Sequence, residues 1–269
     1  MADMQGINQL FDHSKPIIGV VHLFPMIGSP QSTLPFREIR TRALSDAVAL
    51  IDNGIDGVII ENYGDVPFYP DNVEPHTVAA LALIVDEIRE RYPQTPIGVN
   101  VLRNDAKSAM AIATVTDANF IRVNVHTGAM LTDQGLIEGK AHETLRYRSA
   151  LKSDVKIFAD IAVKHAMPLA PIDILASAED TYYRGLADAL IVTGTATGKS
   201  TDLGQLKTVK SAIPQASVLA GSGVTVDSLV EVLQYADGVI VGTSIKRDGV
   251  TTNEVDPDRV RTLIKAREG

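Results

Sequence analysis

Two short apolar runs near the carboxyl end of the chain constrain the fold more than any other feature. The sequence V-L-A-G-S-G-V occupies residues 218–224, and G-V-I-V-G-T-S follows one helix length later at residues 238–244. Continuous apolar runs of this length are typical of strands buried on both faces, as in parallel sheets covered by helices. Each run ends in glycine and hydroxyl residues, which favour a tight turn with free backbone N–H groups. The rest of the chain should therefore alternate strands and helices in the same way.

Six further apolar runs precede these two, and each is followed by a segment with helical periodicity. The predicted strands span residues 17–23, 57–62, 97–102, 120–126, 156–161 and 189–194. The predicted helices span about residues 37–52, 81–88, 106–116, 143–151, 174–184, 202–213, 226–235 and 257–266. This alternation predicts a parallel sheet, and eight units in 269 residues suit a closed (β/α)8 TIM barrel better than an open doubly wound sheet.

Length and composition bound the organisation and exclude several classes of protein. We predict a single α/β domain over residues 1–269, with a lead-in at 1–15 and the barrel at 16–267. The net charge of −8 argues against a nucleic-acid surface, and the absence of cysteine excludes disulfides and thiolate metal sites. Neither a signal peptide nor a membrane-length apolar run is present, so we expect a cytoplasmic protein without membrane insertion.

Polar residues gather where the predicted strands end, which in such barrels is the mouth that carries the chemistry. In the strand at residues 120–126, alternation places Arg122, Asn124 and His126 on one face. A buried arginine needs a partner, and Glu61 and Asp160 are the candidates; a purely structural ion-pair network is the alternative. The residues expected at the mouth are His22, Glu61, Asn62, Asn100, Arg103, Arg122, Asn124, His126, Asp160, Lys164 and His165.

Several of these residues are candidates for acid–base chemistry. His22 and His126 are candidate general acids and bases, or ligands of a metal with Glu61 or Asp160. Their spacing matches no metal motif, so we predict no metal, and simple hydrogen-bonded histidines are the alternative. Asp160 is the better placed carboxylate base. Lys164 is a candidate Schiff-base lysine if it is buried and a solvated lysine otherwise. The sequence identifies no cofactor.

The turns after the last predicted strands are candidates for phosphate binding. In (β/α)8 barrels the loops after strands seven and eight commonly hold a phosphate, so position favours this reading over two plain tight turns. Long loops after the first, second and fourth strands are typical of lids over a small ligand. The turn at residues 195–200 lacks the first glycine of a P-loop, which argues against a nucleotide triphosphatase. The predicted phosphate-binding residues are Gly194, Gly221, Ser222, Gly223, Gly242, Thr243 and Ser244.

Segments along almost the whole chain match a known family. They are P-I-I-G-V-V-H-L at 16–23, D-G-V-I-I-E-N-Y-G-D-V-P-F at 56–68, G-V-N-V-L-R-N-D at 98–105, F-I-R-V-N-V-H at 120–126, T-D-Q-G at 132–135, V-K-H-A at 163–166, I-V-T-G at 191–194, G-S-G-V at 221–224 and V-G-T-S at 241–244. With them the chain closely resembles the BtpA/SgcQ family. The resemblance implies a TIM barrel similar to the ribulose-phosphate-binding group and carries over no established catalytic residues.

Two functions of different classes follow. The first is an enzyme acting on a small phosphorylated metabolite, a phosphosugar or ribosyl compound, by isomerase, lyase or nucleosidase-like chemistry. Arg122, Arg103 and Asn124 would bind the hydroxyl or carbonyl end of that metabolite. The second, implied by the resemblance, is a non-catalytic biogenesis or stability factor for photosystem I or another membrane complex. It would use a partner surface such as residues 66–70 and peripheral membrane association. A homo-oligomer is expected in either case.

Overall fold

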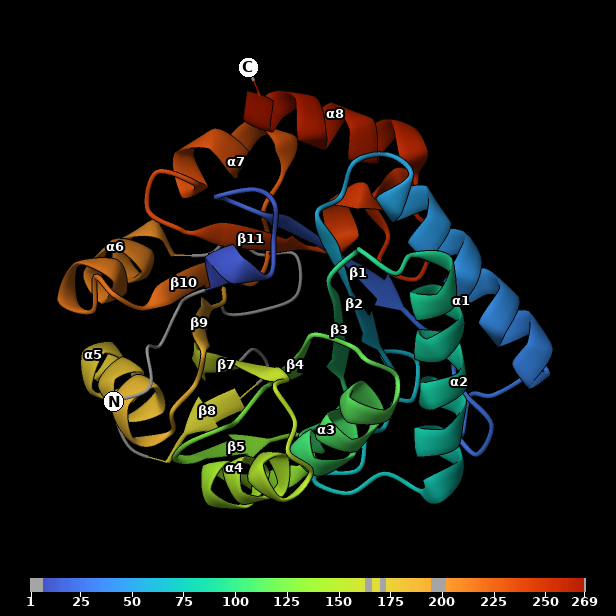
Figure 1. The fold of residues 1–269 in the computed structure, drawn as a ribbon, viewed down its shortest axis with the longest axis horizontal. Coiled ribbons are helices and arrows are strands. Elements are labelled where there is room, and N and C mark those ends of the chain that lie inside the picture. Colours follow the sequence, from blue (N-terminus) through green and yellow to red (C-terminus); the bar gives the residue numbers. More distant parts are fainter. Residues whose placement is uncertain (1–6, 163–165, 170–172, 195–201, 269) are drawn as a thin grey trace.

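The computed structural model describes residues 7–162, 166–169, 173–194 and 202–268. Within them eight parallel strands close into a barrel, because the last strand pairs with the first, and helices surround it (Figure 1). The predicted TIM barrel is confirmed. The barrel strands are β1 (Ile17–His22), β2 (Gly57–Glu61), β3 (Ile97–Asn100), β4 (Phe120–Val123), β7 (Lys156–Ala162), β9 (Ala189–Val192), β10 (Ser217–Ala220) and β11 (Gly238–Val241).

The helices lie close to the positions that periodicity predicts, and local capping explains where several begin. Asp202 accepts hydrogen bonds from Gly204 N and Gln205 N at the start of α6, and Asp105 accepts one from Ser108 N at the start of α3. The helix predicted at 174–184 changes to a wider π turn after residue 179. In the part of the chain that the structure describes, no helix is both long and apolar enough to cross a membrane. The helices and short turns are α1 (Phe36–Ile51), α2 (Pro75–Arg91), α3 (Ala106–Val115), α4 (Ala141–Ala150), α5 (Ile174–Glu179), α6 (Leu203–Ala212), α7 (Val226–Val232), α8 (Pro257–Glu268), η1 (Ile7–Gln9), η2 (Asp180–Arg184), η3 (Thr243–Ile245) and η4 (Arg247–Gly249).

The interior of the barrel is packed at its amino-terminal end. Phe120 and Phe158 stack with ring centroids 4.4 Å apart, and Phe11 from the lead-in packs against Phe120. Gly98 is required beside them, because a Cβ at that position would lie 2.2 Å from the Phe120 ring. Ile7 N donates to the Ser217 hydroxyl, which ties the lead-in to β10. These contacts close one end of the barrel, so a ligand has to enter at the carboxyl ends of the strands.

A small antiparallel sheet stands where the sequence predicts only a loop. Residues 127–142 form the hairpin β5 (Ala129–Thr132) and β6 (Gly135–Glu138), and β8 (Ala166–Pro168) pairs with β5 (Figure 1). Gly135 adopts a positive φ of 91° at the turn, and Met130 and Ile137 bury their side chains against Val125. Because each strand has only three or four residues, its alternation is too short to be read from the sequence.

Candidate active site

A cavity of about 250 Å³ opens at the mouth of the barrel. One wall comes from the ends of β1 and β2 and the loop after β3, and the opposite wall comes from the turns after β10 and β11. Five of the residues predicted for chemistry or substrate binding line this cavity, together with five of the predicted phosphate-binding residues. They are His22, Glu61, Arg103, Arg122, Asn124, Gly221, Ser222, Gly223, Gly242 and Thr243.

Arg122 and Asp160 form a two-pronged ion pair between β4 and β7. The Arg122 guanidinium donates from Nε to Asp160 Oδ2 at 2.9 Å and from Nη2 to Oδ1 at 3.0 Å, and Asn124 Nδ2 lies 3.5 Å from Oδ2. Burial would lower the pKa of Arg122, but the carboxylates of Asp160 and Glu61 outweigh it and raise the pKa above its ordinary value. Asp160 has a fully buried side chain and does not line the cavity. The pair is therefore a fixed cation for the cavity, with its counter-ion held behind it.

Glu61 is the carboxylate that faces the cavity. Asn100 Nδ2 donates to Glu61 Oε2 at 2.6 Å, and Glu61 Oε1 lies 4.0 Å from His22 Nε2. The His22 ring packs edge-on against the Tyr63 ring with centroids 4.7 Å apart. One oxygen of Glu61 is thus oriented by an amide, while the other approaches a histidine at the edge of hydrogen-bond reach. This arrangement suits a proton-transfer pair.

The loop after β3 brings a second arginine to the cavity. Asn62 brackets the Leu102–Arg103 cis peptide: its Oδ1 accepts from Leu102 N at 2.7 Å and its Nδ2 donates to Leu102 O at 3.3 Å. Asn62 therefore positions this loop and does not itself line the cavity. Burial lowers the pKa of Arg103, and the carboxylates of Asp133, Asp160 and Glu61 oppose that change. Arg103 and Arg122 together make the cavity a site for oxygen-rich or anionic groups.

The turns after β9, β10 and β11 meet beside this wall. The Ser222 hydroxyl accepts a hydrogen bond from Gly194 N at 2.9 Å, which ties two of the turns together, so Gly194 has a supporting place outside the cavity lining. Gly223 has a positive φ of 67°. A Cβ on Gly242 would lie 2.8 Å from His22 Cε1, so only glycine lets this turn approach the histidine. Ser244, predicted as part of the set, lines a separate hollow on the outside of the turn.

His126 and Lys164 do not join this group. The structure corrects the prediction that His126 shares a face with Arg122 and Asn124, because β4 ends at Val123 and the chain then turns toward η2. His126 Nε2 lies 2.8 Å from Gly185 O, and burial lowers the pKa of the ring, so His126 is a neutral, hydrogen-bonded histidine away from the cavity. Lys164 and His165 lie outside the described residues.

Sequence reasoning missed two residues of the cavity. Tyr63 lies beside His22; burial, with a contribution from Glu61, raises its pKa, and its hydroxyl makes a hydrogen bond with Thr251. Asp133 reaches the cavity from the β5–β6 turn. A tyrosine two positions after a strand-end glutamate is a weak signal, and Asp133 gave none, because the hairpin that carries it was not predicted.

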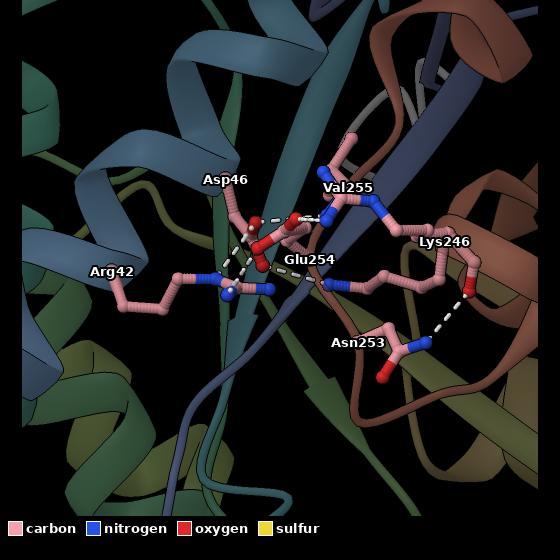
Figure 2. A network of polar contacts seen from close by, with 7 residues as sticks. Arg42, Asp46, Lys246, Asn253, Glu254 and Val255 are labelled. Carbon is pink, nitrogen blue, oxygen red and sulfur yellow. Dashed lines mark hydrogen bonds and ion pairs between the residues drawn. The ribbon is translucent and has the colours of Figure 1, made fainter.

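A buried network behind the β11 turn was also missed (Figure 2). Lys246 Nζ donates to Asp46 Oδ2 at 2.9 Å, while Asp46 Oδ1 accepts from Val255 N at 2.9 Å and from Arg42 Nε at 3.2 Å. Burial lowers the pKa of Lys246, and Asp46 opposes that change. The network fastens residues 246–255 to α1. Within this segment Thr251 bonds the Thr243 hydroxyl at 2.9 Å, so the network also supports the cavity wall.

No group of three or more histidine, aspartate and glutamate side chains within the described ranges is arranged to hold a metal ion. The chemistry that these residues support directly is therefore proton transfer from Glu61 and His22, beside two arginines and a glycine-rich wall. This is the arrangement that a reaction at a hydroxyl or carbonyl carbon of an anionic substrate requires.

Comparison with known proteins places the chain among TIM-barrel proteins. The family model described as the BtpA family matches residues 13–269. The photosystem I biogenesis protein BtpA of Synechocystis sp. is 47% identical over 258 residues, covering 96% of this chain and 90% of the relative. An uncharacterized protein of Thermococcus kodakarensis is 48% identical, with 93% and 94% coverage.

Solved structures share the fold at low sequence identity. The native KDPGal structure superimposes with a TM-score of 0.60 at 16% identity and covers 96% of this chain and 97% of that one. Phosphoribosyl anthranilate isomerase from Thermus thermophilus gives 0.57 at 12% identity, with 94% and 98% coverage. KGPDC from Streptococcus mutans in complex with ribose 5-phosphate also gives 0.57 at 12% identity, with 94% and 98% coverage. At this identity the likeness concerns the fold alone.

Proposed function

The chain belongs to the BtpA family, and from that premise we propose that it is an enzyme acting on a small phosphorylated metabolite, a phosphosugar or ribosyl compound. The observation that carries the proposal is the pairing of two features in one cavity. The glycine-rich turns after β10 and β11 form one wall, and the Glu61–His22 pair with two arginines lies across from them. Solved TIM barrels of similar fold include phosphoribosyl anthranilate isomerase and a complex with ribose 5-phosphate, which supports this class of ligand.

The cavity suggests a division of labour for a proton-transfer reaction. Backbone N–H groups of the turns at Gly221–Gly223 and Gly242–Thr243 would hold the phosphate. Glu61 would remove a proton from a carbon next to a carbonyl or hydroxyl carbon, and His22 would return it elsewhere on the substrate. The negative charge that develops on the substrate oxygen would be stabilised by Arg122 and Arg103. This sequence of steps is that of an isomerase or lyase.

This assignment gives Glu61 the role that sequence reasoning gave to Asp160. Both oxygens of Asp160 are engaged by the Arg122 guanidinium, and its side chain is not exposed. A carboxylate in that position is needed to compensate a buried cation and is poorly placed to accept a proton. Glu61 lines the cavity and has one oxygen that faces it beside His22.

The test is a ligand-induced shift in thermal stability with a matched pair of variants. Thr243→Asp adds a negative charge to the proposed phosphate wall, while Thr243→Asn is nearly isosteric with it and neutral. Ribose 5-phosphate at about 100 times its dissociation constant should stabilise the wild type and Thr243→Asn by about 2.7 kcal/mol. It should leave Thr243→Asp unshifted, and ribose should shift none of the three. Equal shifts in both variants would remove the phosphate wall from the proposal.

A second candidate function rests on an exposed apolar row. Leu136, Leu131 and Met167 are directly paired across the β6–β5–β8 sheet and are 50%, 50% and 70% exposed. Together with the name of the Synechocystis relative, this row supports a factor that binds a membrane protein complex such as photosystem I. Leu131→Asp should then abolish co-purification with that complex while Glu61→Gln leaves it intact. The opposite pattern favours the enzyme.

A further inference from the structure

A second hollow lies beside the cavity. It has a volume of about 330 Å³ and is walled by the loops that follow β1, β2 and β3 and by the start of α2. Phe68 and Leu102 line both hollows, so these two side chains form the ridge between them. Leu102 is buried, whereas Phe68 is only partly buried. The two hollows are therefore adjacent compartments of one mouth, and a ligand longer than a pentose phosphate has room to cross the ridge.

The walls of the second compartment are mainly flat and apolar. Pro30, Pro67 and the rings of Phe68 and Tyr69 contribute to it, with Val73 near the start of α2. Tyr69 is 53% exposed, an unusual position for an aromatic ring that has no apolar partner to cover it. Proline and aromatic rings present planar faces, which pack best against another planar group. The shape therefore favours a ring over a second sugar.

Two polar groups in this compartment are placed for a hydrogen-bonding ligand. Asp65 is held in position, because Oδ1 accepts from Met26 N at 2.7 Å and Oδ2 accepts from Asn62 Nδ2 at 3.2 Å. A carboxylate has further lone pairs available to a donor. The Ser29 hydroxyl oxygen is buried and has no hydrogen-bond partner among the described residues. A buried hydroxyl without a partner costs free energy, which a ligand group can recover.

The charges of the two compartments differ in sign. The first contains Arg103 and Arg122. Among the described residues that line the second there is neither lysine nor arginine, while Asp65 is a carboxylate and His76 stands at the rim. A second phosphate or a carboxylate would meet a like charge there. The group that fits is uncharged or weakly basic and carries an N–H donor.

We infer that the second compartment receives an uncharged aromatic amine or nitrogen heterocycle carried by the phosphorylated sugar. The inference rests on the proposed function and narrows it, because it identifies the substrate as a ring-bearing ribosyl phosphate rather than a bare phosphosugar. The phosphate lies at the glycine-rich turns, the sugar lies between Glu61 and Arg103, and the ring crosses the Phe68–Leu102 ridge to place an N–H on Asp65.

Calorimetric titration of the full chain tests this with probes that differ only beyond the sugar. Ribose 5-phosphate occupies the first compartment alone, adenosine and cytidine 5′-monophosphates add a ring, and ribose 1,5-bisphosphate adds a charge. The wild type should bind at least one of the nucleotides ten times more tightly than ribose 5-phosphate. The bisphosphate should gain nothing. Equal affinity for ribose 5-phosphate and both nucleotides overturns the inference and leaves the proposed function standing.

Variants of the second compartment locate the gain. Ser29→Phe fills the hollow and should remove the tenfold preference, with the affinity for ribose 5-phosphate unchanged within a factor of two. Tyr69→Ala removes one exposed wall, changes no buried contact of its ring, and should reduce the preference if Ser29→Phe fails to fold. Val230→Phe on the exposed face of α7 is the matched control. A preference that survives both Ser29→Phe and Tyr69→Ala places the ring elsewhere and overturns the inference. Failure of the wild type to bind any phosphorylated probe overturns the proposed function as well.

Discussion

At the amino-terminal end of the barrel one polar arrangement occurs four times, whereas the polar residues of the mouth form a cluster without a repeat. In each repeat, the residue before a strand accepts a hydrogen bond from a backbone N–H at the start of the preceding barrel strand, and a cation from a helix bonds the same side chain. The four sets are Asp56 with Ile17 N and Arg267, Asn119 with Ile97 N and Arg89, Asp188 with Ile157 N and Arg148, and Asp237 with Val218 N and Lys210.

Each repeat joins two strands and a helix at a single oxygen-bearing side chain. The acceptors precede β2, β4, β9 and β11, which are every second strand of the barrel, and the cations come from α8, α2, α4 and α6. A strand start exposes a backbone N–H that needs a partner when it is buried, and the cation compensates the acceptor. The arrangement therefore solves a structural problem that recurs around the barrel.

The mouth combines its charges differently. Arg122 pairs with Asp160, Asn100 orients Glu61, and Lys246 pairs with Asp46, each with its own geometry. No strand-by-strand rule predicts them, because each solves a local requirement of one wall of the cavity. The difference teaches that repetition at one end marks stability, while individual, asymmetric placement at the other marks a site.

The largest effect is expected from breaking the pair at the centre of the mouth. Asp160→Ala leaves the buried Arg122 guanidinium without the carboxylate that holds both of its prongs. We expect a loss of about 3–5 kcal/mol in the free energy of unfolding, measured by urea denaturation. The double variant Arg122→Met/Asp160→Leu should recover most of that loss, because it removes both charges. A single-variant loss below about 1 kcal/mol would mean that solvent already compensates the arginine.

The next effect concerns the network behind the β11 turn. Lys246→Met removes the buried ammonium but leaves Asp46 with Arg42 and Val255 N, so we expect a loss of about 3 kcal/mol, near the lower limit for a buried charge without its partner. Because the segment that carries Thr251 and braces Thr243 is loosened, affinity for ribose 5-phosphate should also fall about tenfold. Titration calorimetry under native conditions separates this loss from the stability change.

The comparison is sharpened by a variant at the opposite end. Asp188→Ala removes the acceptor of Ile157 N and the partner of Arg148, and should cost about 2 kcal/mol of unfolding free energy. Its affinity for ribose 5-phosphate should stay within a factor of two of the wild type. If Asp188→Ala weakened ligand binding as much as Lys246→Met, the separation of the two ends into stability and function would be lost.

The smallest effect is a pH dependence from the histidine that the cavity excludes. Burial lowers the pKa of His126 in the folded state, so the unfolded chain binds this proton more readily. The free energy of unfolding should therefore fall as pH drops from about 7 to about 5, by no more than about 1.4 kcal/mol per pH unit from this group. His126→Gln should flatten that part of the curve. His142→Gln, at an exposed histidine, should leave it as it is in the wild type.

Much of the architecture was predictable from local patterns. The eight apolar runs become the eight barrel strands, since a strand buried on both faces needs a continuous run whatever its partner is. The prediction failed where the pattern was short, as in the β5–β6 hairpin, and where alternation was extended past the end of a strand, as at His126. In both places the decisive contacts are long-range, to Val125 and β8 and to Gly185.

The sequence by itself determined the barrel, the end of it that carries the polar residues, and the glycine-rich turns, because each depends on the period or composition of neighbouring residues. Only the tertiary structure decided which carboxylate faces the cavity. Asp160 and Glu61 are equivalent as strand-end acids, and the guanidinium of Arg122 on the strand adjacent to Asp160 engages one and leaves the other facing the ligand. Lys246 and Asp46 lie 200 positions apart, and their pairing depends on the closure of the barrel, which no local pattern encodes.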